Sequence, residues 1–232
     1  MWTIHRGPPC RGDSMNRPQE RQTIAPSAIL PTMRVITGRY KGRRLQTPAG
    51  TTSRPILDRV KVSLFDWLGS RLGEPGRLPP ISVCDLFCAG GSQGIEALSR
   101  GATFCAFVEK DRSALVCLRK NLDTLGIAKE AVVVNQPAES VALRPPTGDG
   151  FGLIFVDPPY RLSEDVSEGS PAFRVFAGLG TRIVTMPEAL VLWRHDDNCT
   201  LPQAAPGGWM TIERRRWGSM AITLFQQSQV QA

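Results

Sequence analysis

Four short apolar runs, separated by segments with helical spacing, restrict the fold of this chain more than any other feature. The runs cover residues 81–87, 104–109, 131–135 and 151–156, and each has the length of a buried strand. Between them, residues 94–100 and 112–125 have the apolar spacing of helices. Strands that alternate with helices indicate a doubly wound α/β domain with a mostly parallel sheet and right-handed crossovers. In such sheets ligands bind beyond the carboxyl ends of the strands.

Weaker patterns predict further elements on both sides of this region. Residues 189–193 resemble a fifth strand, and residues 210–216 and 219–225 resemble a closing antiparallel pair joined at Trp217-Gly218. Residues 33–50 predict a short β-hairpin with cations on its exposed face. Asp58 is expected to begin a helix. The expected buried side of that helix holds Val60, Leu64, Trp67 and Leu68, and the residues expected off that side are Arg59, Lys61 and Asp66.

The composition along the chain predicts three parts. Residues 1–32 are rich in Pro, Arg, Gln and Ser without periodicity, which is typical of a disordered tail. Residues 33–75 form an expected basic extension, and residues 80–228 form the expected α/β domain. The stretch 161–186 gives no firm secondary-structure prediction.

The positive charge is concentrated near the amino terminus. Residues 1–61 hold 12 Lys or Arg and three acids, whereas the remaining 171 residues hold 16 basic and 18 acidic residues. This asymmetry indicates a segment that binds a polyanion, attached to a nearly neutral body.

The six cysteines argue against a metal site and against a disulfide scaffold. They form no C-x-x-C pair, and the chain has only two histidines. Cys84, Cys88 and Cys105 lie in apolar runs and are expected to be small core residues. No stretch approaches 18 consecutive apolar residues, and the first 30 residues lack the apolar run of a secretory signal. A soluble, cytoplasmic protein is therefore expected.

The sequence Asp157-Pro158-Pro159-Tyr160, called the DPPY segment below, directly follows the apolar run 151–156. Each proline fixes its own φ and lacks an N–H, and it also biases the residue before it towards extended geometry. The segment would therefore present a carboxylate, free carbonyl groups and a flat aromatic ring at the end of a strand. An exocyclic amine of a nucleobase matches these groups, although a simple strand-to-loop turn is the alternative for a DPPY sequence taken by itself.

Two acids and a glycine-rich turn predict a second ligand site at the same edge of the sheet. Asp85 lies near the end of the first run, which continues through Phe87 into a loop with Gly91 and Gly94. Glu109 ends the second run, where a carboxylate can accept the hydroxyls of an adenosine ribose. Asp85 and the lack of a complete G-x-G-x-x-G motif disfavour a nicotinamide cofactor. An acid at that position suits the positively charged amino group of S-adenosylmethionine.

Taken in order, these motifs resemble those of the RsmD-type small-subunit rRNA (guanine-N2) methyltransferases, from Met33 to Phe225. The resemblance rests on MRVITGRYKGRRLQTPAG, RPILDRVKVSLFDWL, DLFCAGGSQGIEALSRGA, FVEKD and FVDPPY. Ala89 occupies a position where the family usually has glycine, and Pro137 one where an Asp is common. The resemblance implies a class I methyltransferase fold, with a seven-stranded, mostly parallel sheet and an antiparallel C-terminal strand. It also implies that the protein binds S-adenosylmethionine and methylates N2 of one guanosine in 16S rRNA, free or in a small-subunit assembly particle.

The resemblance assigns roles to particular positions. The expected catalytic residues are Asp157, Pro158, Pro159 and Tyr160. The expected cofactor-binding residues are Asp85, Phe87, Ala89, Gly91, Gly94, Glu109, Lys110, Pro137 and Ala138. The expected RNA-binding residues are Arg34, Arg39, Lys41, Arg43, Arg44, Arg54, Arg59 and Lys61, and no metal site is expected.

In the mechanism that we infer, the Asp157 carboxylate and the Pro158 carbonyl each accept one N2–H of guanine, and Tyr160 stacks on the base. Asp157 is also a candidate acceptor for the departing proton. Two other functions fit parts of the sequence. One is methylation of an adenine amine in DNA, although the chain has no region large enough for the separate DNA-recognition domain that this function would need. The other is a non-catalytic RNA-binding module with an altered cofactor loop. A monomer is expected, and RNA contact at Arg214-Arg215-Arg216 is left open.

Overall fold

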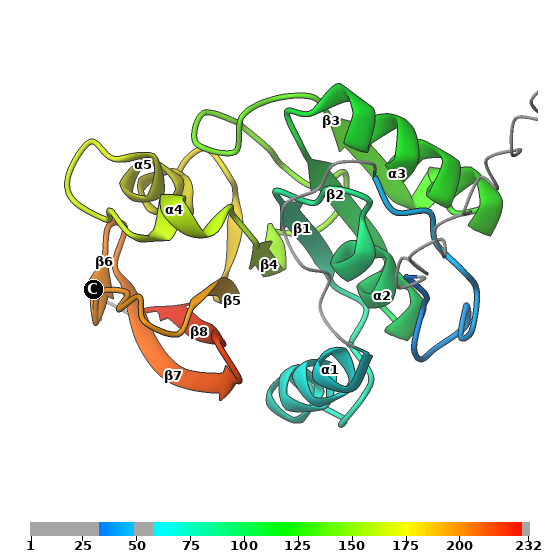
Figure 1. Ribbon diagram of the computed structural model, residues 1–232, viewed down its shortest axis with the longest axis horizontal. Helices are drawn as coiled ribbons and strands as arrows, with labels where there is room; N and C mark the ends of the chain where they lie inside the picture. Colours follow the sequence, from blue (N-terminus) through cyan, green and yellow to red (C-terminus); the bar gives the residue numbers. More distant parts are fainter. Residues whose placement is uncertain (1–32, 49–57, 229–232) are drawn as a thin grey trace, which may run out of the picture. The chain divides into compact units, whose positions relative to one another are not determined.

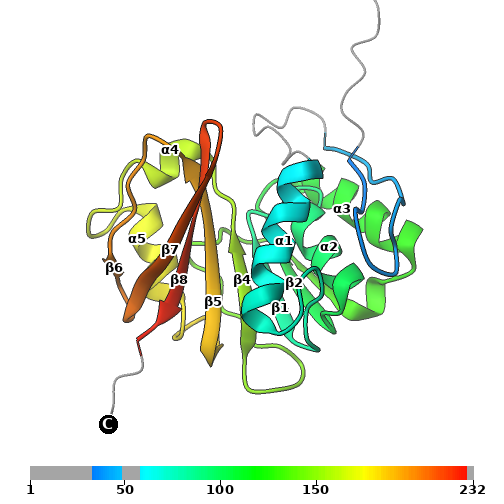
Figure 2. The same cartoon turned by 90° about the horizontal axis from the view of Figure 1, so that it is seen from below.

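The computed structural model describes residues 33–48 and 58–228, and it contains one mixed sheet flanked by helices (Figures 1 and 2). The strand order is β3-β2-β1-β4-β5-β8-β7-β6. The strands are β1 (Ser82–Leu86), β2 (Phe104–Val108), β3 (Ala131–Val134), β4 (Phe151–Val156), β5 (Thr185–Asp196), β6 (Ala204–Ala205), β7 (Trp209–Trp217) and β8 (Met220–Gln227). The helices are α1 (Asp58–Leu72), α2 (Ser92–Arg100), α3 (Arg112–Leu125), α4 (Tyr160–Ser163) and α5 (Pro171–Gly178), with a 3-10 turn η1 (Ala128–Glu130).

The order of the strands places the switch point of the sheet between β1 and β4. From β1 the chain moves outward to β2 and β3, and it then returns to the other side of β1 as β4. The pairs among β1, β2, β3, β4 and β5 are parallel, whereas β8 is antiparallel to both β5 and β7. This is the predicted class I methyltransferase arrangement, in which a crevice opens beyond β1 and β4.

Alternate residues of the central strands pack into two separate cores. Val83, Phe107 and Phe155 belong to the core that also holds the apolar residues of α1, α2 and α3. Leu86, Val108 and Val156 belong to the core under α5. The three cysteines that were predicted to be core residues, Cys84, Cys88 and Cys105, are all buried. The sheet is therefore covered on both faces, which explains why its strands are continuous apolar runs.

The expected number of seven strands was wrong, because the described sheet has eight. The additional strand is β6, which consists of two residues that pair with Met210 and Trp209 of β7. A two-residue strand has no periodicity, so only its tertiary pairing defines it. β5 is also longer than expected, because a register shift against β4 lets pairing begin at Thr185.

The segment Met33–Pro48 turns back on itself beside α2. Arg34 and Arg44 form an antiparallel bridge, and the Val35 N–H donates to the Arg43 carbonyl at 3.0 Å. The described part of the predicted hairpin thus has one bridge in place of two strands. Glu96 in α2 holds the turn by accepting hydrogen bonds from the Ile36 and Thr37 N–H groups at 2.8 and 3.0 Å.

Helix α1 begins at Asp58 as predicted, but the expected exposure of Lys61 was wrong. Only 2% of Lys61 is exposed, and its ammonium donates to Ser92 Oγ at 2.7 Å and to the Arg34 carbonyl at 3.3 Å. The segment 33–48 and α2 cover a flank of α1 that the helix would expose if it packed only on the sheet. The sequence pattern of one helix does not reveal a second neighbour, and the expected RNA contact at Lys61 is therefore corrected.

No helix in the described ranges is both long and apolar enough to cross a bilayer.

Candidate active site

The DPPY segment and the loop after β1 lie together because β1 and β4 end side by side. Leu86 and Val156 are register partners, and the Asp157 N–H donates to the Leu86 carbonyl at 3.3 Å. The residue after each strand therefore emerges at the same edge of the sheet. Sequence spacing placed both motifs at strand ends, and the strand order makes them neighbours.

The Asp157 carboxylate is held on both oxygens by side chains from other elements. Oδ1 forms an ion pair with Arg194 Nε of β5 at 2.5 Å, and Oδ2 accepts a hydrogen bond from Gln93 Nε2 of α2 at 3.0 Å. Burial raises the pKa of Asp157, while the Arg194 charge and the Gln93 hydrogen bond act in the opposite direction. These contacts fix the orientation of the carboxylate and favour its ionised form.

Arg194 and Gln93 were not singled out from the sequence, and both are nearly fully buried, with exposed fractions of 3% and 5%. One signal was present for Arg194, because an arginine inside an apolar strand requires a partner. No comparable signal marks Gln93, since a glutamine near the start of a helix is ordinary.

The backbone of the DPPY segment leads directly into α4. The Pro159 carbonyl accepts a hydrogen bond from the Leu162 N–H at 2.9 Å, which forms the first turn. Trp193 Nε1 donates to Ser163 Oγ at 2.9 Å and fastens the end of that helix to β5. The Arg194 guanidinium also lies 5.8 Å from the centroid of the Tyr160 ring, within the range of a cation–π contact. Arg194 thus contacts both the acid and the aromatic residue of the segment.

Asp85 has a buried carboxyl oxygen that is suited to a ligand. Its Oδ2 accepts a hydrogen bond from the Gly94 N–H at 2.9 Å, while Oδ1 is buried and lacks a hydrogen-bond partner in the described chain. Burial raises the pKa of Asp85 to about 8, and the charges of Asp157 and Glu109 add to this effect. An ammonium group next to Oδ1 would favour the carboxylate and satisfy the orphaned oxygen. This is the fit expected for the amino group of S-adenosylmethionine.

Glu109 closes the other side of the loop after β1. Its Oε2 accepts from the Ala89 N–H at 3.1 Å, and its Oε1 accepts from the N–H groups of Lys110 and Asp111 at 2.8 and 2.9 Å. A carboxylate has about four acceptor positions, so one remains. Binding both hydroxyls of a ribose there would require the bond from Ala89 to open.

The two glycines expected to contact the cofactor have packing reasons to be glycine. Gly91 has φ +82°, and a Cβ there would lie 2.4 Å from Leu118 Cδ1. A Cβ on Gly94 would lie 2.4 Å from the Phe107 ring. Ala89 and Phe87 adopt positive φ values of 47° and 60° without being glycine, which is costly for L-residues.

The remaining expected cofactor-binding residues surround this loop at different depths. Phe87 is half-buried and Lys110 is exposed. Pro137 is exposed and follows β3, with its carbonyl accepting from the Ser140 N–H at 3.2 Å. Ala138 is buried in the core under α5.

The expected RNA-binding cations are divided between paired and unpaired side chains. Arg34 pairs with Asp58 at 2.8 Å, Arg39 pairs with Glu130, and Arg43 donates to the Thr124 carbonyl at 2.8 Å. The exposed residues Lys41, Arg44 and Arg59 form no ion pair with any described residue. Arg54 lies outside the described residues. The cations therefore contribute unequally to the field of this surface.

Within the described part of the chain, no group of three or more His, Cys, Asp or Glu side chains is arranged to hold a metal ion.

Known proteins resemble this chain over almost all of the described region. The family model described as "Conserved hypothetical protein 95" matches residues 33–226. The YlbH protein of Bacillus subtilis is 43% identical over 197 residues, which cover 84% of this chain and 99% of YlbH. Ribosomal RNA small subunit methyltransferase D of Escherichia coli K12 is 39% identical over 198 residues, which cover 84% of this chain and 90% of that enzyme. The solved structure of yhhF from Escherichia coli aligns with a TM-score of 0.67 at 31% identity, covering 85% of this chain and 99% of that one. The chain belongs to the family of conserved hypothetical protein 95, the RsmD family.

Proposed function

We propose that this protein transfers a methyl group from S-adenosylmethionine to the exocyclic N2 of a guanosine in 16S rRNA. The observation that carries this proposal is the position of the DPPY segment directly beside the end of β1, where Asp85 and Glu109 accept hydrogen bonds from Gly94 and Ala89. A relative that is 39% identical is named for methylation of the RNA of the small ribosomal subunit, which supports the choice of substrate.

The cofactor would be held by the residues after β1 and β2. Asp85 Oδ1 would accept from the amino group, and Glu109 would accept from the ribose. When bound, S-adenosylmethionine supplies a methyl group on a sulfonium sulfur, which is a good leaving group. The protein therefore needs to do little for the sulfur, and its main task is to position the amine.

The DPPY segment would position that amine. The lone pair of guanine N2 is delocalised into the ring, so the nitrogen must be turned and fixed before it attacks. The Asp157 carboxylate and the Pro158 carbonyl would each accept one N2–H, while Tyr160 would stack on the base. The Pro159 carbonyl already accepts from Leu162, which makes Pro158 the better acceptor of the two. Such alignment is worth about 7–11 kcal/mol in well-oriented reactions.

The contacts of Asp157 favour one of its two conceivable roles. Arg194 and Gln93 hold both oxygens of its carboxylate, which suits a fixed hydrogen-bond acceptor, although burial outweighs their charge and hydrogen bond and raises its pKa. We therefore assign it mainly to orientation. The proton lost from the methylated nitrogen would pass through Asp157 or directly to water.

A nucleoside analysis tests this function. The purified protein is incubated with S-adenosylmethionine and 16S rRNA from cells that lack the gene, both as free RNA and as small-subunit particles. We expect N2-methylguanosine by mass spectrometry with the wild type and a loss of at least about a hundredfold with Asp157→Ala, since positioning is lost. Methylation of adenine in DNA would identify the alternative enzyme. A lack of cofactor binding in calorimetry would identify the non-catalytic RNA-binding alternative.

A further inference from the structure

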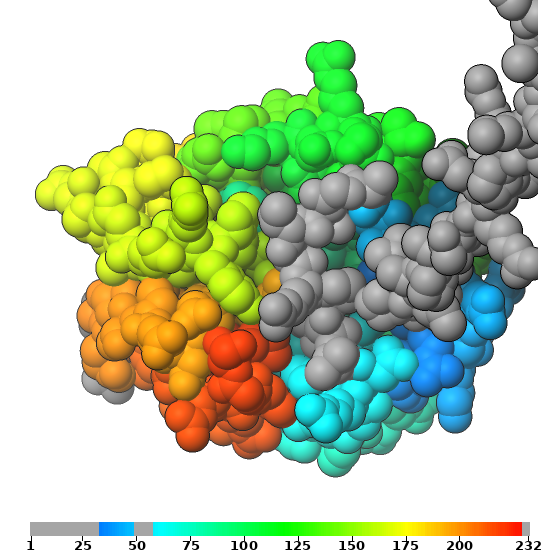
Figure 3. All heavy atoms as spheres, in the orientation of Figure 1, coloured from blue at the N-terminus to red at the C-terminus, as the bar shows by residue number. Residues whose placement is uncertain are grey.

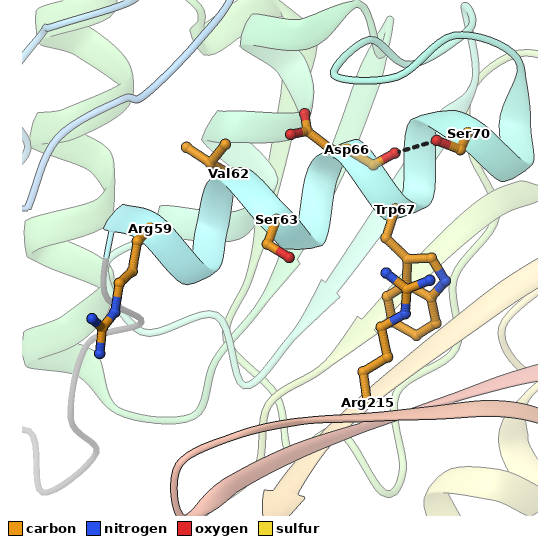
Figure 4. A pocket seen from close by; sticks show the side chains of 7 residues that line it. All are labelled: Arg59, Val62, Ser63, Asp66, Trp67, Ser70 and Arg215. Atoms are coloured by element: carbon orange, nitrogen blue, oxygen red, sulfur yellow. Dashed lines mark hydrogen bonds between the residues drawn. The ribbon is translucent and has the colours of Figure 1, made fainter.

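A groove between α1 and β7, lined by both polar and apolar side chains, lies outside the site described above. It has a volume of about 400 Å³ and is lined on one side by α1 and on the other by Arg215 of β7. Figure 4 shows Arg59 near the start of the helix, Ser63 in the middle, and the Arg215 guanidinium over the Trp67 ring. The surfaces of α1 (cyan) and of the closing strands (red) meet in Figure 3.

Arg215 is held in place by a small network. Its guanidinium lies 4.5 Å from the Trp67 ring centroid, and its Nε donates to Glu213 Oε1 at 2.7 Å. Glu213 also accepts from Trp67 Nε1 at 3.1 Å and from Arg71. These contacts fix the arginine without burying it, since 42% of its side chain is exposed. An arginine that is oriented in advance loses less entropy when it binds an anion.

The groove lies on the same face of the sheet as the Asp157 carboxylate. Arg194 is the register partner of Ile222 in β8, and Ile222 is the register partner of Arg215 in β7. Register partners in an antiparallel pair point to the same face, so Arg215 lies two strands, or about 10 Å, from Arg194. In Figure 2 the start of α1, α4 and the turn between β7 and β8 lie at one edge of the sheet. Arg59 is thus at the edge where the DPPY segment emerges.

The charges of the groove fit a polyanion. Arg59 and Arg215 face it from two elements, against one acid in its lining, Asp66. Arg214 and Arg216 alternate to the opposite face of β7, where they are exposed and share Asp197, so they lie outside the groove. We propose that this groove binds the sugar–phosphate backbone of the RNA beside the target nucleotide, with Arg59 and Arg215 as its phosphate contacts. The proposal rests on the proposed function for RNA as the substrate, and it extends the RNA-binding surface beyond residues 33–61.

A charge-matched comparison tests the groove. The double variant Arg59→Gln/Arg215→Gln is compared with Arg77→Gln/Arg144→Gln, which removes two exposed cations that precede β1 and β4 and hence lie at the opposite edge of the sheet. Binding of fluorescent 16S rRNA is measured by anisotropy over a range of salt concentrations. Circular dichroism and calorimetry with S-adenosylmethionine check that both variants fold and bind the cofactor.

The affinity K for RNA falls as salt rises, and each lost phosphate contact reduces the magnitude of the slope of log K against log salt by about 0.7 on single-stranded RNA. We expect the loss of two contacts in the groove variant to reduce the magnitude of the slope by about 1.4. The variant should also raise KM for RNA while leaving kcat at saturating RNA unchanged. The control should leave the slope near that of the wild type. Equal slopes in the two variants would overturn the groove proposal. If the wild type made no N2-methylguanosine, the proposed function would fail, yet a difference in slope would still support the groove.

Discussion

Arg194 is the residue that most changes the chemistry expected at Asp157. A lone aspartate in a DPPY segment could orient an amine or deprotonate it. The buried ion pair at 2.5 Å fixes the carboxylate and opposes the rise in its pKa that burial causes. The cation–π contact with Tyr160 makes the same arginine support the stacking ring. Arg194 is therefore a positioning residue that acts through its two neighbours.

Replacing this arginine should make methylation depend on pH. The groups around Asp157 are Arg194, Gln93 and the acid Asp85. In Arg194→Met the pKa of Asp157 should rise further, because burial is then opposed only by Gln93. Activity should fall more at pH 6 than at pH 8.5, since the carboxylate is regained as pH rises. Initial rates across this range measure the effect, with Arg194→Lys as partial rescue. An equal loss at every pH would indicate a structural role alone.

Ala89 gives a prediction about stability. Its φ of 47° is a left-handed conformation that costs an L-residue about 1–2 kcal/mol, whereas glycine adopts it readily. Ala89→Gly should therefore raise the free energy of unfolding by up to about 1 kcal/mol, after the greater flexibility of unfolded glycine is subtracted. Guanidinium denaturation measures it. Ala97→Gly in the middle of α2 is the control, and it should lower stability by about 1 kcal/mol.

At the scale of elements, one buried charge network joins the amino-terminal segment to α2 and α1. Glu96 is fully buried and pairs with Arg100 at 2.7 Å while it holds the Ile36 and Thr37 N–H groups. The Lys61 ammonium lies in the same region, and burial lowers its pKa against the attraction of Glu96. Polar groups of α2 thus attach the segment 33–48 to the domain. The boundary of the basic extension at residue 75 stays a prediction.

Neutralising Glu96 should loosen this attachment. Glu96→Gln keeps the volume but leaves the buried Arg100 without its anionic partner, which typically costs about 3–5 kcal/mol. The exposed pair Arg77–Glu74 supplies the matched control, Glu74→Gln, with an expected effect below about 1 kcal/mol. Urea denaturation gives both values, and hydrogen exchange at residues 36–40 should accelerate only in Glu96→Gln. Equal stability of the two variants would contradict this account.

At the scale of the whole molecule, cofactor binding should stabilise the fold through Asp85. A ligand at about 100 times its Kd adds about 2.7 kcal/mol, or roughly 5–10 °C in Tm for a domain of this size. S-adenosylmethionine should give this shift with the wild type and little or none with Asp85→Asn, which cannot pair with an ammonium group. Differential scanning fluorimetry measures it. An unchanged shift in the variant would place the amino group elsewhere.

The sequence determined the strands and helices around the site and the motifs, because both depend on local patterns, whereas it predicted neither α4 nor α5. α3 and β4 have the predicted ends. Asp111 caps the start of α3, Gly150 precedes β4, and Pro158 follows β4 after Asp157. The motif residues Asp85, Glu109 and Asp157 lie near the ends of β1, β2 and β4, where spacing put them.

Only the tertiary structure decided which side chains meet. Arg194 follows Asp157 by 37 positions and Gln93 precedes it by 64, so no local pattern links them; the order β1-β4-β5 does. Lys61 has the sequence signature of an exposed cation, yet α2 and the segment 33–48 cover it. The groove between α1 and β7 likewise arises from elements about 150 positions apart in the chain. The apolar periodicity of an element indicates the one side that packs against the core. The contacts that define this site are made on other sides of the elements, and only the tertiary structure shows them.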